Sequence, residues 1–439
     1  MRRRSPTFAA LVLVLGGCLL GGGCSGTTGT DAGPGGSTTT APSRPPGTIR
    51  VPADQPTIQA AVDAAVPGDL VLISPGTYKE TVTIEKPNLV LRGLDRAGVV
   101  IDGEGKRENG VKAFGDGVVI ENLTVKNHAA NGIFVSGDAG SDTGPSNGYS
   151  GDGGRQLVGF RVSYVTALAN ELYGVYAFAA QDGSFDHVYA SGSADAGVYV
   201  GRCDPCNTVV TDVLAEHNAI GFEGTNASTG LVVTRSTWRA NRVGITSNSQ
   251  KLEKKAPQHD AVIVGNLVDG TDAATSPPQA SGAFGLGIAI GGGRKDQVLR
   301  NRVVNNAAFG ITVTDLDEYA PEANVISDNV LSGNGTDIGV YRTQIATLPA
   351  GAACVSGNEA TTYLPPDLPT VAACGVAKGT EVTAKIPTLP KAPPGVKGAD
   401  LPAPLPQPSM PDAATAPARP ATGGPPTVDL EAITVPAAS

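Results

Sequence analysis

The sequence predicts an all-β chain wound as a single-stranded parallel β-helix, a solenoid in which each coil pairs with the coils before and after it. Three observations predict this fold. Short β-like runs are bounded by Gly, Asp or Asn; turn formers are abundant, with 58 Gly and 34 Pro in 439 residues; and one motif recurs about every 23 residues. Aromatic residues are 5% and charged residues 17% of the chain, which argues against a coiled coil, a helical bundle or a nucleic-acid binder.

The recurring motif is a glycine followed by a β-branched or aromatic residue. It occurs at Gly132, Gly174, Gly197, Gly221, Gly244, Gly287, Gly310 and Gly339. Successive glycines lie 42, 23, 24, 23, 43, 23 and 29 residues apart, so the two longest spacings indicate one coil plus an insertion. We expect about ten coils, and at a strand spacing of roughly 4.8 Å these form a rod about 45 to 50 Å long.

The two ends of the chain differ from the repeats. Ile58, Ala61, Val62 and Ala65 recur at helical spacing before Pro67-Gly68, which predicts one short helix that covers the open end of the first coil. Residues 25–47 are rich in Gly, Ser, Thr and Pro and predict a disordered tether. Residues 379–439 are rich in Pro and Ala and predict an extended, disordered tail. The coils then occupy residues 48–345 and a C-terminal cap residues 346–378.

The first 24 residues are typical of an export leader. Arg2 to Arg4 form a basic start, and the apolar run Phe8 to Leu15 is too short to span a bilayer. Cys18 and Cys24 each follow small residues, as in the bacterial lipobox, and we favour Cys24 because flexible polar sequence begins right after it. We therefore expect an exported protein anchored by a lipid to the outer face of the cell membrane. The alternative is an ordinary secretory leader with incidental cysteines.

Four cysteines remain after the leader. They are Cys203, Cys206, Cys354 and Cys374, and an even count outside the cytoplasm favours disulfides. The Cys203-x-x-Cys206 spacing also suits a redox or half-metal site, but no second such pair and no nearby His pair completes a zinc site. We expect Cys354 and Cys374 to clasp the end of the folded region.

Three segments carry a family resemblance. The runs Thr57–Asp69, Gly76-Thr-Tyr-Lys-Glu80 and Leu89-Val-Leu-Arg-Gly93, followed by the Gly-Ile/Val coils, resemble right-handed parallel β-helix proteins of the pectin-lyase-like superfamily over residues 48–345. The resemblance implies right-handed coiling. It does not choose a reaction, because that superfamily includes lyases, esterases, hydrolases, epimerases, adhesins and noncatalytic accessory proteins.

Two closer resemblances stop at the site residues. Gly76 to Glu80 is similar to the Gly-x-Tyr-x-Glu opening of pectin methylesterases, but their Gln-Ala-Val, Asp-Phe and Arg-Pro-Trp segments are missing, so this activity is not expected. Asp204-Pro205-Cys206 is similar to the Asp-Pro-His of mannuronan epimerases, with Cys206 in place of the histidine. Only Asp204 carries over from that motif.

The repeats also predict a ligand-binding face. The residue after each glycine is apolar and predicted to enter the core, so period two turns the next residue outward. That outward column is Phe134, Tyr176, Tyr199, Glu223, Thr246, Ala289, Thr312 and Tyr341. The same alternation turns the glycines, Asp195 and Arg242 outward. We expect Phe134, Tyr176, Tyr199, Asp195 and Arg242 to bind sugar rings. The alternative is that stacked aromatics only stabilise neighbouring coils.

Candidate catalytic residues lie on or beside this column. If the protein is a uronate lyase or epimerase, Glu223, Asp204 or His217 would handle the proton, and Arg242 or a late lysine would neutralise the uronate. Asp195 and Glu223 make a poor hydrolase pair, because their Cα atoms are expected about 14 Å apart and glycosidase carboxylates lie roughly 5 to 9.5 Å apart. Basic residues between 235 and 302 could recognise uronates or phosphates, or form an ordinary charged face.

Four insertions are predicted to form one rim. Residues 138–156, 201–207, 249–260 and 315–323 all follow the same strand of the coil. Asp138, Asp142 and Asp152 in the first insertion could bind Ca²⁺, although solvated turns also explain them. No cofactor is required.

The expected function is the binding of an extended polysaccharide or cell-envelope glycan, with catalysis left open. The alternatives are a noncatalytic surface adhesin and a periplasmic accessory protein. We expect a monomer without a nucleic-acid partner.

Overall fold

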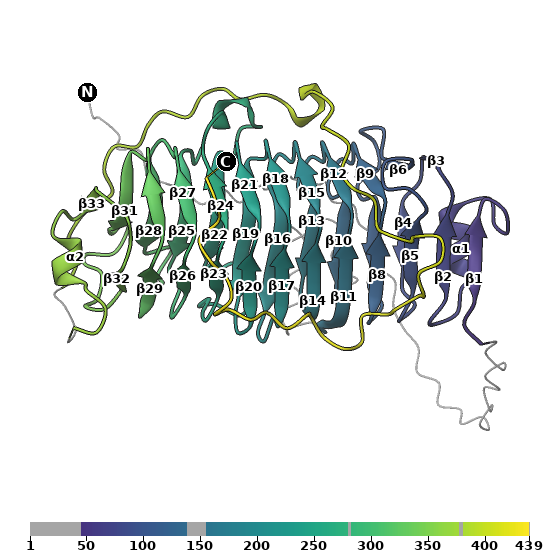
Figure 1. The fold of residues 1–439 in the computed structure, drawn as a ribbon, viewed down its shortest axis with the longest axis horizontal. Coiled ribbons are helices and arrows are strands. Elements are labelled where there is room, and N and C mark those ends of the chain that lie inside the picture. The colour runs from purple at the N-terminus through teal and green to yellow at the C-terminus, as the bar shows by residue number, and fades with distance from the viewer. Residues whose placement is uncertain (1–44, 138–154, 280–281, 377–380, 439) are drawn as a thin grey trace, which may run out of the picture.

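The computed structural model describes residues 45–137, 155–279, 282–376 and 381–438. The chain winds as a right-handed parallel β-solenoid with three parallel sheets, here named A, B and C, that run the length of the rod (Figure 1). The predicted fold class is confirmed. Sheet A has twelve strands, so the solenoid makes about twelve turns rather than ten. The sequence motif missed the turns at both ends, where no repeat glycine marks the coil.

The strands follow one another in the order A, B, C along each turn. Sheet A contains β1 (Thr48–Val51), β2 (Leu70–Ile73), β5 (Val90–Gly93), β8 (Val118–Glu121), β11 (Leu157–Ser163), β14 (Ala180–Asp186), β17 (Thr208–Thr211), β20 (Leu231–Thr234), β23 (Val262–Val264), β26 (Gln297–Leu299), β29 (Asn324–Ser327) and β32 (Ala353–Ser356). Sheet B contains β3 (Gly76–Tyr78), β6 (Val99–Asp102), β9 (Thr124–Lys126), β12 (Thr166–Leu168), β15 (Tyr189–Ser191), β18 (Leu214–Glu216), β21 (Thr237–Arg239), β24 (Leu267–Asp269), β27 (Arg302–Val304) and β30 (Val330–Ser332). Sheet C contains β4 (Val82–Ile84), β7 (Val111–Ala113), β10 (Ile133–Ser136), β13 (Val175–Phe178), β16 (Ala196–Cys203), β19 (Ile220–Ala227), β22 (Val243–Asn248), β25 (Leu286–Gly291), β28 (Phe309–Thr314), β31 (Thr336–Val340) and β33 (Tyr363–Leu364).

The residues that follow the repeat glycines stack in register along sheet C and fill the core. The stack runs through Ile133, Val175, Val198, Phe222, Ile245, Ile288 and Ile311. In the next coil Ile338 pairs with Ile311, and Gly339 lies opposite Thr312. Tyr341 therefore lies two positions beyond the predicted column, because the last Gly-Val pair is not the equivalent of the earlier ones.

The repeat glycines face inward, not outward as predicted. A Cβ on Gly197 would lie 2.9 Å from Asn218 Nδ2, and a Cβ on Gly221 would lie 2.9 Å from Asn241 Nδ2. The register pairs Ala196 with Ile220 and then Val198 with Phe222, so the alternation breaks at the glycine. A larger residue does not fit there, which is the physical reason for the repeat.

Buried asparagines form a ladder at the corner between sheets A and B. Asn266 Nδ2 donates to Asn301 Oδ1 at 3.0 Å, Asn301 Nδ2 to Asn329 Oδ1 at 3.0 Å, and Asn329 Nδ2 to Asn358 Oδ1 at 2.9 Å. Each amide also bonds a backbone carbonyl of the preceding coil. The ladder thereby satisfies polar groups that the turn would leave unpaired.

The predicted N-terminal helix is α1 (Ile58–Ala64), which covers the first coils (Figure 1). Thr57 caps the helix by accepting a hydrogen bond from Ala60 N at 3.1 Å. Within the helix, the side chains of Ile58 and Val62 are buried. Within the part of the chain that the structure describes, no helix is long and apolar enough to cross a membrane.

The C-terminal end departs from the predicted boundary at residue 345. Strands β32 and β33 continue sheets A and C, so coil structure extends to Leu364. The short helix α2 (Leu368–Val371) follows, and a disulfide joins Cys354 to Cys374. A second disulfide joins Cys203 to Cys206.

The Pro/Ala-rich tail is extended, as predicted, but residues 381–438 have a defined course over the rod rather than a disordered one (Figure 1). Arginines of the coils donate to tail carbonyls, as from Arg92 to Ala416 O at 2.6 Å and from Arg302 to Pro436 O at 2.8 Å. Proline residues lack an N–H donor but keep their carbonyls, so arginine side chains can hold a proline-rich segment without strand pairing.

Candidate functional site

A row of aromatic side chains lies on the outer face of sheet C. Ring centroids are 5.9 Å apart for Phe114 and Phe134, 5.2 Å for Phe134 and Tyr176, and 4.6 Å for Tyr176 and Tyr199. These spacings are those of interacting aromatic pairs. The row follows from the coil register, which places Phe134, Tyr176 and Tyr199 opposite one another on β10, β13 and β16.

The row is covered rather than open to solvent. Phe134, Tyr176 and Tyr199 are at most 1% exposed. Tyr173 stacks on Tyr176 with ring centroids 4.5 Å apart, and Leu286 packs at the edge of the same cluster. The prediction of an open floor for sugar rings is therefore wrong in this conformation. Strand alternation indicates which face a side chain takes, but not what later segments place over it.

Three carboxylates lie where the aromatic row ends. Glu223 follows Tyr199 in the outward column, and the Tyr199 hydroxyl donates to Glu253 at 2.9 Å to Oε1 and 3.2 Å to Oε2. Thr225 Oγ1 donates to Glu223 Oε1 at 3.3 Å. Glu223 is 9% exposed, and its Oε2 is buried without a hydrogen-bond partner among the described residues.

The carboxylates shift one another's ionisation. Burial raises the pKa of Glu223 well above its ordinary value, and the charges of Asp195 and Glu253 raise it further. Burial raises the pKa of Asp195 to about 6, against a hydrogen bond with Tyr173 that lowers it. Burial raises the pKa of Glu253 to about 7, although the Tyr199 hydrogen bond and the Arg202 charge lower it. Burial and two acidic neighbours therefore favour the protonated form of Glu223, and burial favours that of Asp195.

Asp195 and Glu223 act on each other despite their expected Cα separation. Asp195 directly precedes Ala196, which pairs with Ile220, so the two carboxyl residues lie on neighbouring strands and several positions apart. The Asp195 charge is, after burial, a cause of the raised pKa of Glu223.

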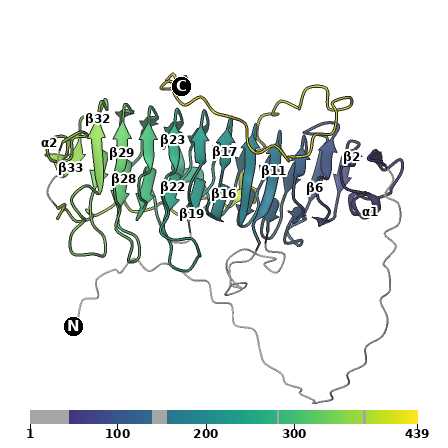
Figure 2. The same cartoon turned by 90° about the horizontal axis from the view of Figure 1, so that it is seen from below.

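Glu253 is the site residue that the sequence analysis did not find. It lies in the insertion at residues 249–258, which Asn226 holds against the rod: Asn226 Nδ2 donates to Gln250 O at 2.8 Å and to Glu253 O at 3.0 Å. Three of the predicted insertions, 201–207, 249–260 and 315–323, lead from sheet C to sheet A and lie along one edge, where loops project from the rod in Figure 2; residues 138–154 of the first insertion lie outside the described residues. The shared edge was the available signal, but it did not indicate which loop residue turns inward.

Arg242 does not face the carboxylates. Its Nε donates to Ser276 O at 3.4 Å, its guanidinium lies 5.9 Å from the centre of the Phe284 ring, and it is 1% exposed. Ser276, Phe284 and Gly395 of the tail lie against Arg242, and its role in binding substrate stays a prediction.

Asp204 and His217 also lie apart from the cluster. Asp204 lies between the disulfide-bonded Cys203 and Cys206, and its carboxylate is 3.7 Å from His259 Nε2. His217 Nδ1 is 2.8 Å from Thr275 Oγ1. Neither is among the groups that shift the pKa of Glu223. Of the three predicted catalytic residues, Glu223 alone is in the carboxylate cluster.

The predicted Ca²⁺ ligands Asp138, Asp142 and Asp152 lie outside the described residues. Among the described residues, no group of three or more His, Cys, Asp or Glu side chains could hold a metal ion.

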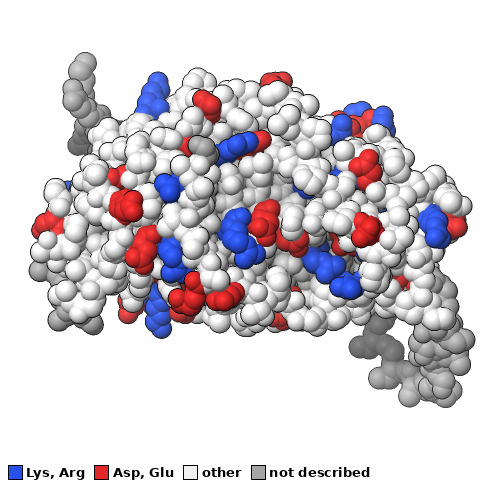
Figure 3. Space-filling model, in the orientation of Figure 1, with Lys and Arg blue, Asp and Glu red and all other residues white. Residues whose placement is uncertain are grey.

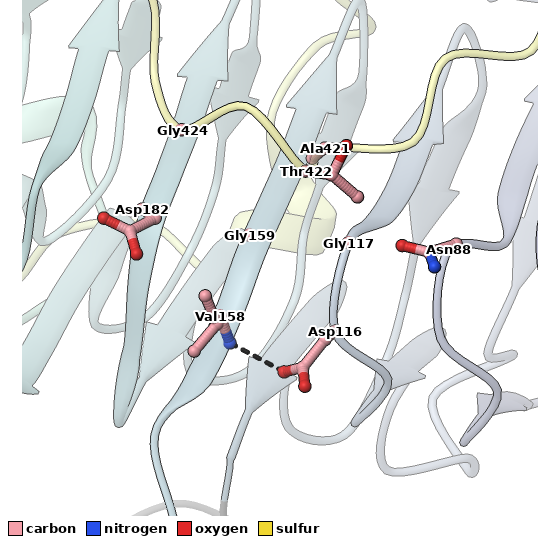
Figure 4. Close-up of a pocket in the computed structure, with 9 residues that line it drawn as sticks. All are labelled: Asn88, Asp116, Gly117, Val158, Gly159, Asp182, Ala421, Thr422 and Gly424. Carbon is pink, nitrogen blue, oxygen red and sulfur yellow. Dashed lines mark hydrogen bonds between the residues drawn. The ribbon is translucent and has the colours of Figure 1, made fainter.

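A separate hollow of about 260 Å³ lies where the tail crosses sheet A (Figure 4). Asp116, Asp182 and Asn88 line it below, and Ala421 and Thr422 of the tail lie above it. Asp116 Oδ1 already accepts a hydrogen bond from Val158 N at 2.7 Å. The hollow has a polar edge but no convergent reactive groups.

The basic residues between 235 and 302, expected either to recognise uronates or phosphates or to form an ordinary charged face, include several that pair with groups of the protein. Figure 3 shows cations and anions interspersed on the face in view. Arg239 pairs with Glu216 at 2.6 Å and Lys251 with Asp317 at 3.8 Å, while Arg300 donates to Leu430 O of the tail at 2.8 Å. Each such contact uses a charge that an anionic ligand would need.

Comparison with known proteins finds similarity of fold. The A-module of mannuronan C-5 epimerase AlgE4 from Azotobacter vinelandii is 15% identical, with 69% of this chain and 90% of that chain covered and a TM-score of 0.46. Pectate lyase Pel9A is 16% identical, with 70% of this chain and 73% of that chain covered and a TM-score of 0.41. The catalytic domain of a GH87 α-1,3-glucanase is 14% identical, with 81% of this chain and 70% of that chain covered and a TM-score of 0.39. No family model and no curated protein matches the chain.

Proposed function

We propose that this protein binds an extended polysaccharide along sheet C and hydrolyses it at Glu223 and Asp195. The observation that carries the proposal is Glu223, a buried carboxyl with one unpartnered oxygen, beside a second carboxylate at the end of an aromatic row. Perturbed carboxyls that gather on one face of a rigid scaffold are typical of acid–base sites.

The two carboxyls have complementary roles. Burial and its acidic neighbours raise the pKa of Glu223, which suits it to donate a proton to the glycosidic oxygen as the bond from that oxygen to C1 breaks. Asp195 is mainly ionised, so it accepts a proton from the water whose oxygen bonds to C1. One water is consumed, two hydroxyl ends form, and solvent exchange returns the proton to Glu223.

The position of Arg242 favours hydrolysis over the uronate lyase or epimerase chemistry expected from the sequence. Both of those reactions build negative charge on a uronate, which a nearby cation must stabilise. Arg242 instead contacts Ser276 and Phe284, and no described cation lowers the pKa of Glu223 or Asp195.

Substrate access requires the insertion at residues 249–258 to move, because it carries Glu253 over the cluster. Its outward side is weakly held: Leu252 is 45% exposed, and the Lys251 ammonium, itself 54% exposed, is 3.8 Å from Asp317. Such exposed ion pairs contribute little to the stability of the contact. We infer that displacement of this loop opens the aromatic row to a sugar chain.

The test is a panel of neutral, amino and acidic glycans incubated with the protein, with new reducing ends and unsaturated products both recorded. We expect reducing ends, and a loss of about 100-fold or more for Glu223→Gln. The exposed Glu359→Gln is the matched control and should keep full activity. Unsaturated products, or activity unchanged in Glu223→Gln, would contradict the assignment.

A noncatalytic glycan-binding role is the second candidate. The observation that favours it is the complete burial of Tyr176 and Tyr199, which also suits a purely structural aromatic row. Retention on a glycan column without product, lost in the double variant Tyr176→Ala and Tyr199→Ala, would select binding. Retention by the double variant would exclude the aromatic row as the binding surface.

We also propose export and lipid anchoring at Cys24, with Cys18 as the alternative position. The leader and both cysteines lie outside the described residues, so the proposal rests on the sequence pattern. Cells fed labelled palmitate should label the wild-type protein and not Cys24→Ser. Label that persists in Cys24→Ser and disappears in Cys18→Ser would move the site.

A further inference from the structure

We propose that the guanidinium of Arg242 binds a singly charged oxyanion, such as a carboxylate or a phosphodiester, in competition with Gly395 of the tail. The oxyanion is a free ion or an acidic group of a polymer that lies along sheet C. The inference goes beyond the proposed function, because it concerns a site apart from Glu223 and Asp195 and requires no bond to break.

Arg242 is a buried cation without a described counter-charge. Its side chain is 1% exposed, and burial lowers its pKa with no charge of the described residues acting on it. An arginine nevertheless stays protonated at neutral pH. Arg92, which is equally buried, pairs with Glu121 at 2.6 Å. A buried charge without such a partner is costly, so a bound anion would stabilise the Arg242 side chain.

The hydrogen-bond donors of Arg242 are incompletely used. Its Nε donates to Ser276 O at 3.4 Å, and its Nη2 is buried without an acceptor among the described residues. A planar guanidinium can donate from two nitrogens to two oxygens of one anion. A carboxylate or a phosphodiester would supply both the missing acceptor and the missing charge, whereas a hydroxyl would supply only an acceptor.

The tail covers Arg242 but does not bond its free donor. Elsewhere an arginine of the coils donates to a tail carbonyl, as from Arg96 to Pro408 O at 3.0 Å. At Arg242 the tail instead presents the α-carbon of Gly395, where a Cβ would collide with Arg242 Nη2. An anion that displaces Gly395 therefore breaks no described hydrogen bond between Arg242 and the tail.

The position of Arg242 suits a ligand that follows sheet C. Asp195, Ala219 and Arg242 directly precede the paired strands β16, β19 and β22, so they lie in register on consecutive coils. Two coil spacings, about 10 Å, separate Asp195 from Arg242. An extended polymer on sheet C could thus place an acidic group at Arg242 while a different part of the same chain lies at Asp195.

The number of cations indicates the charge of the ligand. Arg239, on the preceding strand, pairs with Glu216 at 2.6 Å, which leaves Arg242 to act as a single positive charge. A carboxylate or a phosphodiester carries one negative charge, whereas a terminal phosphate carries about 1.5 to 2 at neutral pH. A singly charged group therefore matches this site.

The experiment is calorimetry of the full chain at pH 7 with four probes: hexagalacturonate, its methyl ester, a hexamer of glycerol phosphate and free galacturonate. We expect at least one acidic hexamer to bind about tenfold or more tightly than the uncharged ester, with an affinity that falls as salt is added. Free galacturonate that binds as tightly as the hexamer would assign the site to a free ion. Tighter binding of the hexamer would assign it to a polymer.

Substitutions in the tail test the competition. Gly395→Ala places a methyl group against Arg242 Nη2 and should displace the tail, so an acidic hexamer should bind at least about threefold more tightly than in the wild type. Gly424→Ala is the matched control, because Gly424 also has a positive φ, 76° against 82° for Gly395, and its Cβ would meet no atom within 4 Å. The control should bind as the wild type does.

A substitution of the arginine tests the site itself. Arg242→Gln should lower the affinity for an acidic hexamer to that for the ester, and Arg242→Lys should retain part of the preference because it keeps the charge. Thermal midpoints identify a variant that fails to fold. If Arg242→Gln fails, the comparison of Gly395→Ala with Gly424→Ala decides the matter.

The outcomes separate this inference from the proposed function. Equal binding of the acidic hexamers and the ester, in the wild type and in Gly395→Ala, would overturn the inference. A preference for acid that persists in Arg242→Gln would overturn the assignment to Arg242, and an equal gain in Gly424→Ala would overturn the competition with Gly395. Cleavage of a neutral glycan without any preference for acid would support the proposed function alone, and preference for acid without cleavage would support this inference alone.

Discussion

Glu253 connects the insertion to the carboxylate cluster, and its ionisation should make folding depend on pH. Burial raises its pKa to about 7, so the folded protein favours the protonated form. This contribution is fully present below the pKa of an unfolded glutamate, near 4.3, and is lost as pH rises through about 7.

Glu253→Gln should therefore gain stability relative to the wild type between pH 5 and pH 8. A shift of this size corresponds to at most about 3 kcal/mol. Thermal midpoints at both pH values check the prediction, with Glu359→Gln as the exposed control. Parallel pH profiles for the wild type and Glu253→Gln would show that Glu253 ionises as it does in the unfolded chain.

Tyr199→Phe removes the hydroxyl that donates to both oxygens of Glu253. The pKa of Glu253 should rise, because the lost hydrogen bond favours the charged form. Stability should fall by about 1 to 3 kcal/mol, which urea unfolding measures at pH 8. Tyr164→Phe is the control, because the Tyr164 ring is only partly buried, and it should lower the free energy of unfolding by less. An equal loss of stability in both variants would contradict the hydrogen bond between Tyr199 and Glu253.

At this scale the sequence located part of the site. The coil register follows directly from the repeats, so Tyr176, Tyr199 and Glu223 were predicted on one face, and they are. Glu253 could not be predicted, because it belongs to an insertion between β22 and β23, and the 23-residue repeat does not determine the course of an insertion. The enclosure of Arg242 depends on Ser276, on Phe284 and on the tail at Gly395, which are all remote from it in sequence.

Among the elements, the asparagine ladder fixes the corner between sheets A and B. Asn301 receives a bond from Asn266, donates to Asn329 and bonds Ile263 O. Asn301→Ala should destabilise the protein by about 2 to 4 kcal/mol, since it leaves several buried groups unpaired. Unfolding in urea compares it with Gln297→Ala, an exposed position on β26 that should change stability little. If Asn301→Ala lowered the free energy of unfolding as little as Gln297→Ala does, the ladder would not be a stabilising feature.

Asn226 makes three of the hydrogen bonds that hold the insertion at residues 249–258 against the rod. Asn226→Ala deletes hydrogen bonds to Gln250 N, Gln250 O and Glu253 O. Amide hydrogen exchange in this insertion should accelerate by roughly 100-fold, from about 1 kcal/mol per bond. Exchange in α1 should not change. Uniform acceleration throughout the rod would instead indicate global destabilisation.

Across the whole molecule, the tail acts as an external strap, defined here as residues 381–438. Arg92 is buried, pairs with Glu121 at 2.6 Å, and donates to Ala416 O and Pro417 O. Elastase cleavage after Ala413 should be slow in the wild type and at least about tenfold faster in Arg92→Met, because a released segment becomes accessible.

Arg302→Met provides a milder companion variant, since it removes one bond from Arg302 Nε to Pro436 O and no buried ion pair. It should loosen the strap near Pro436 and leave elastase cleavage after Ala413 unchanged. Fast cleavage after Ala413 in the wild type would show that the strap is unbound in solution.

The fold itself was predictable at this scale, and the strap was not. A period of 23 with inward apolar residues fixes a solenoid, because only stacked coils bury that pattern. Composition placed residues 379–439 in the class of unstructured segments, since Pro and Ala offer little to a core. Carbonyl acceptors matched to arginines spaced along a rod leave no local signature in sequence.

The strap also constrains how the rod can grow. Each added coil lengthens the rod by about 4.8 Å, and a chain of coils tolerates duplication because each contacts only its neighbours. The strap contacts Arg342 near one end and Arg92 near the other, through a fixed number of residues. A duplicated coil between these arginines would therefore leave a strap carbonyl short of its donor, so the number of coils and the length of the strap must change together.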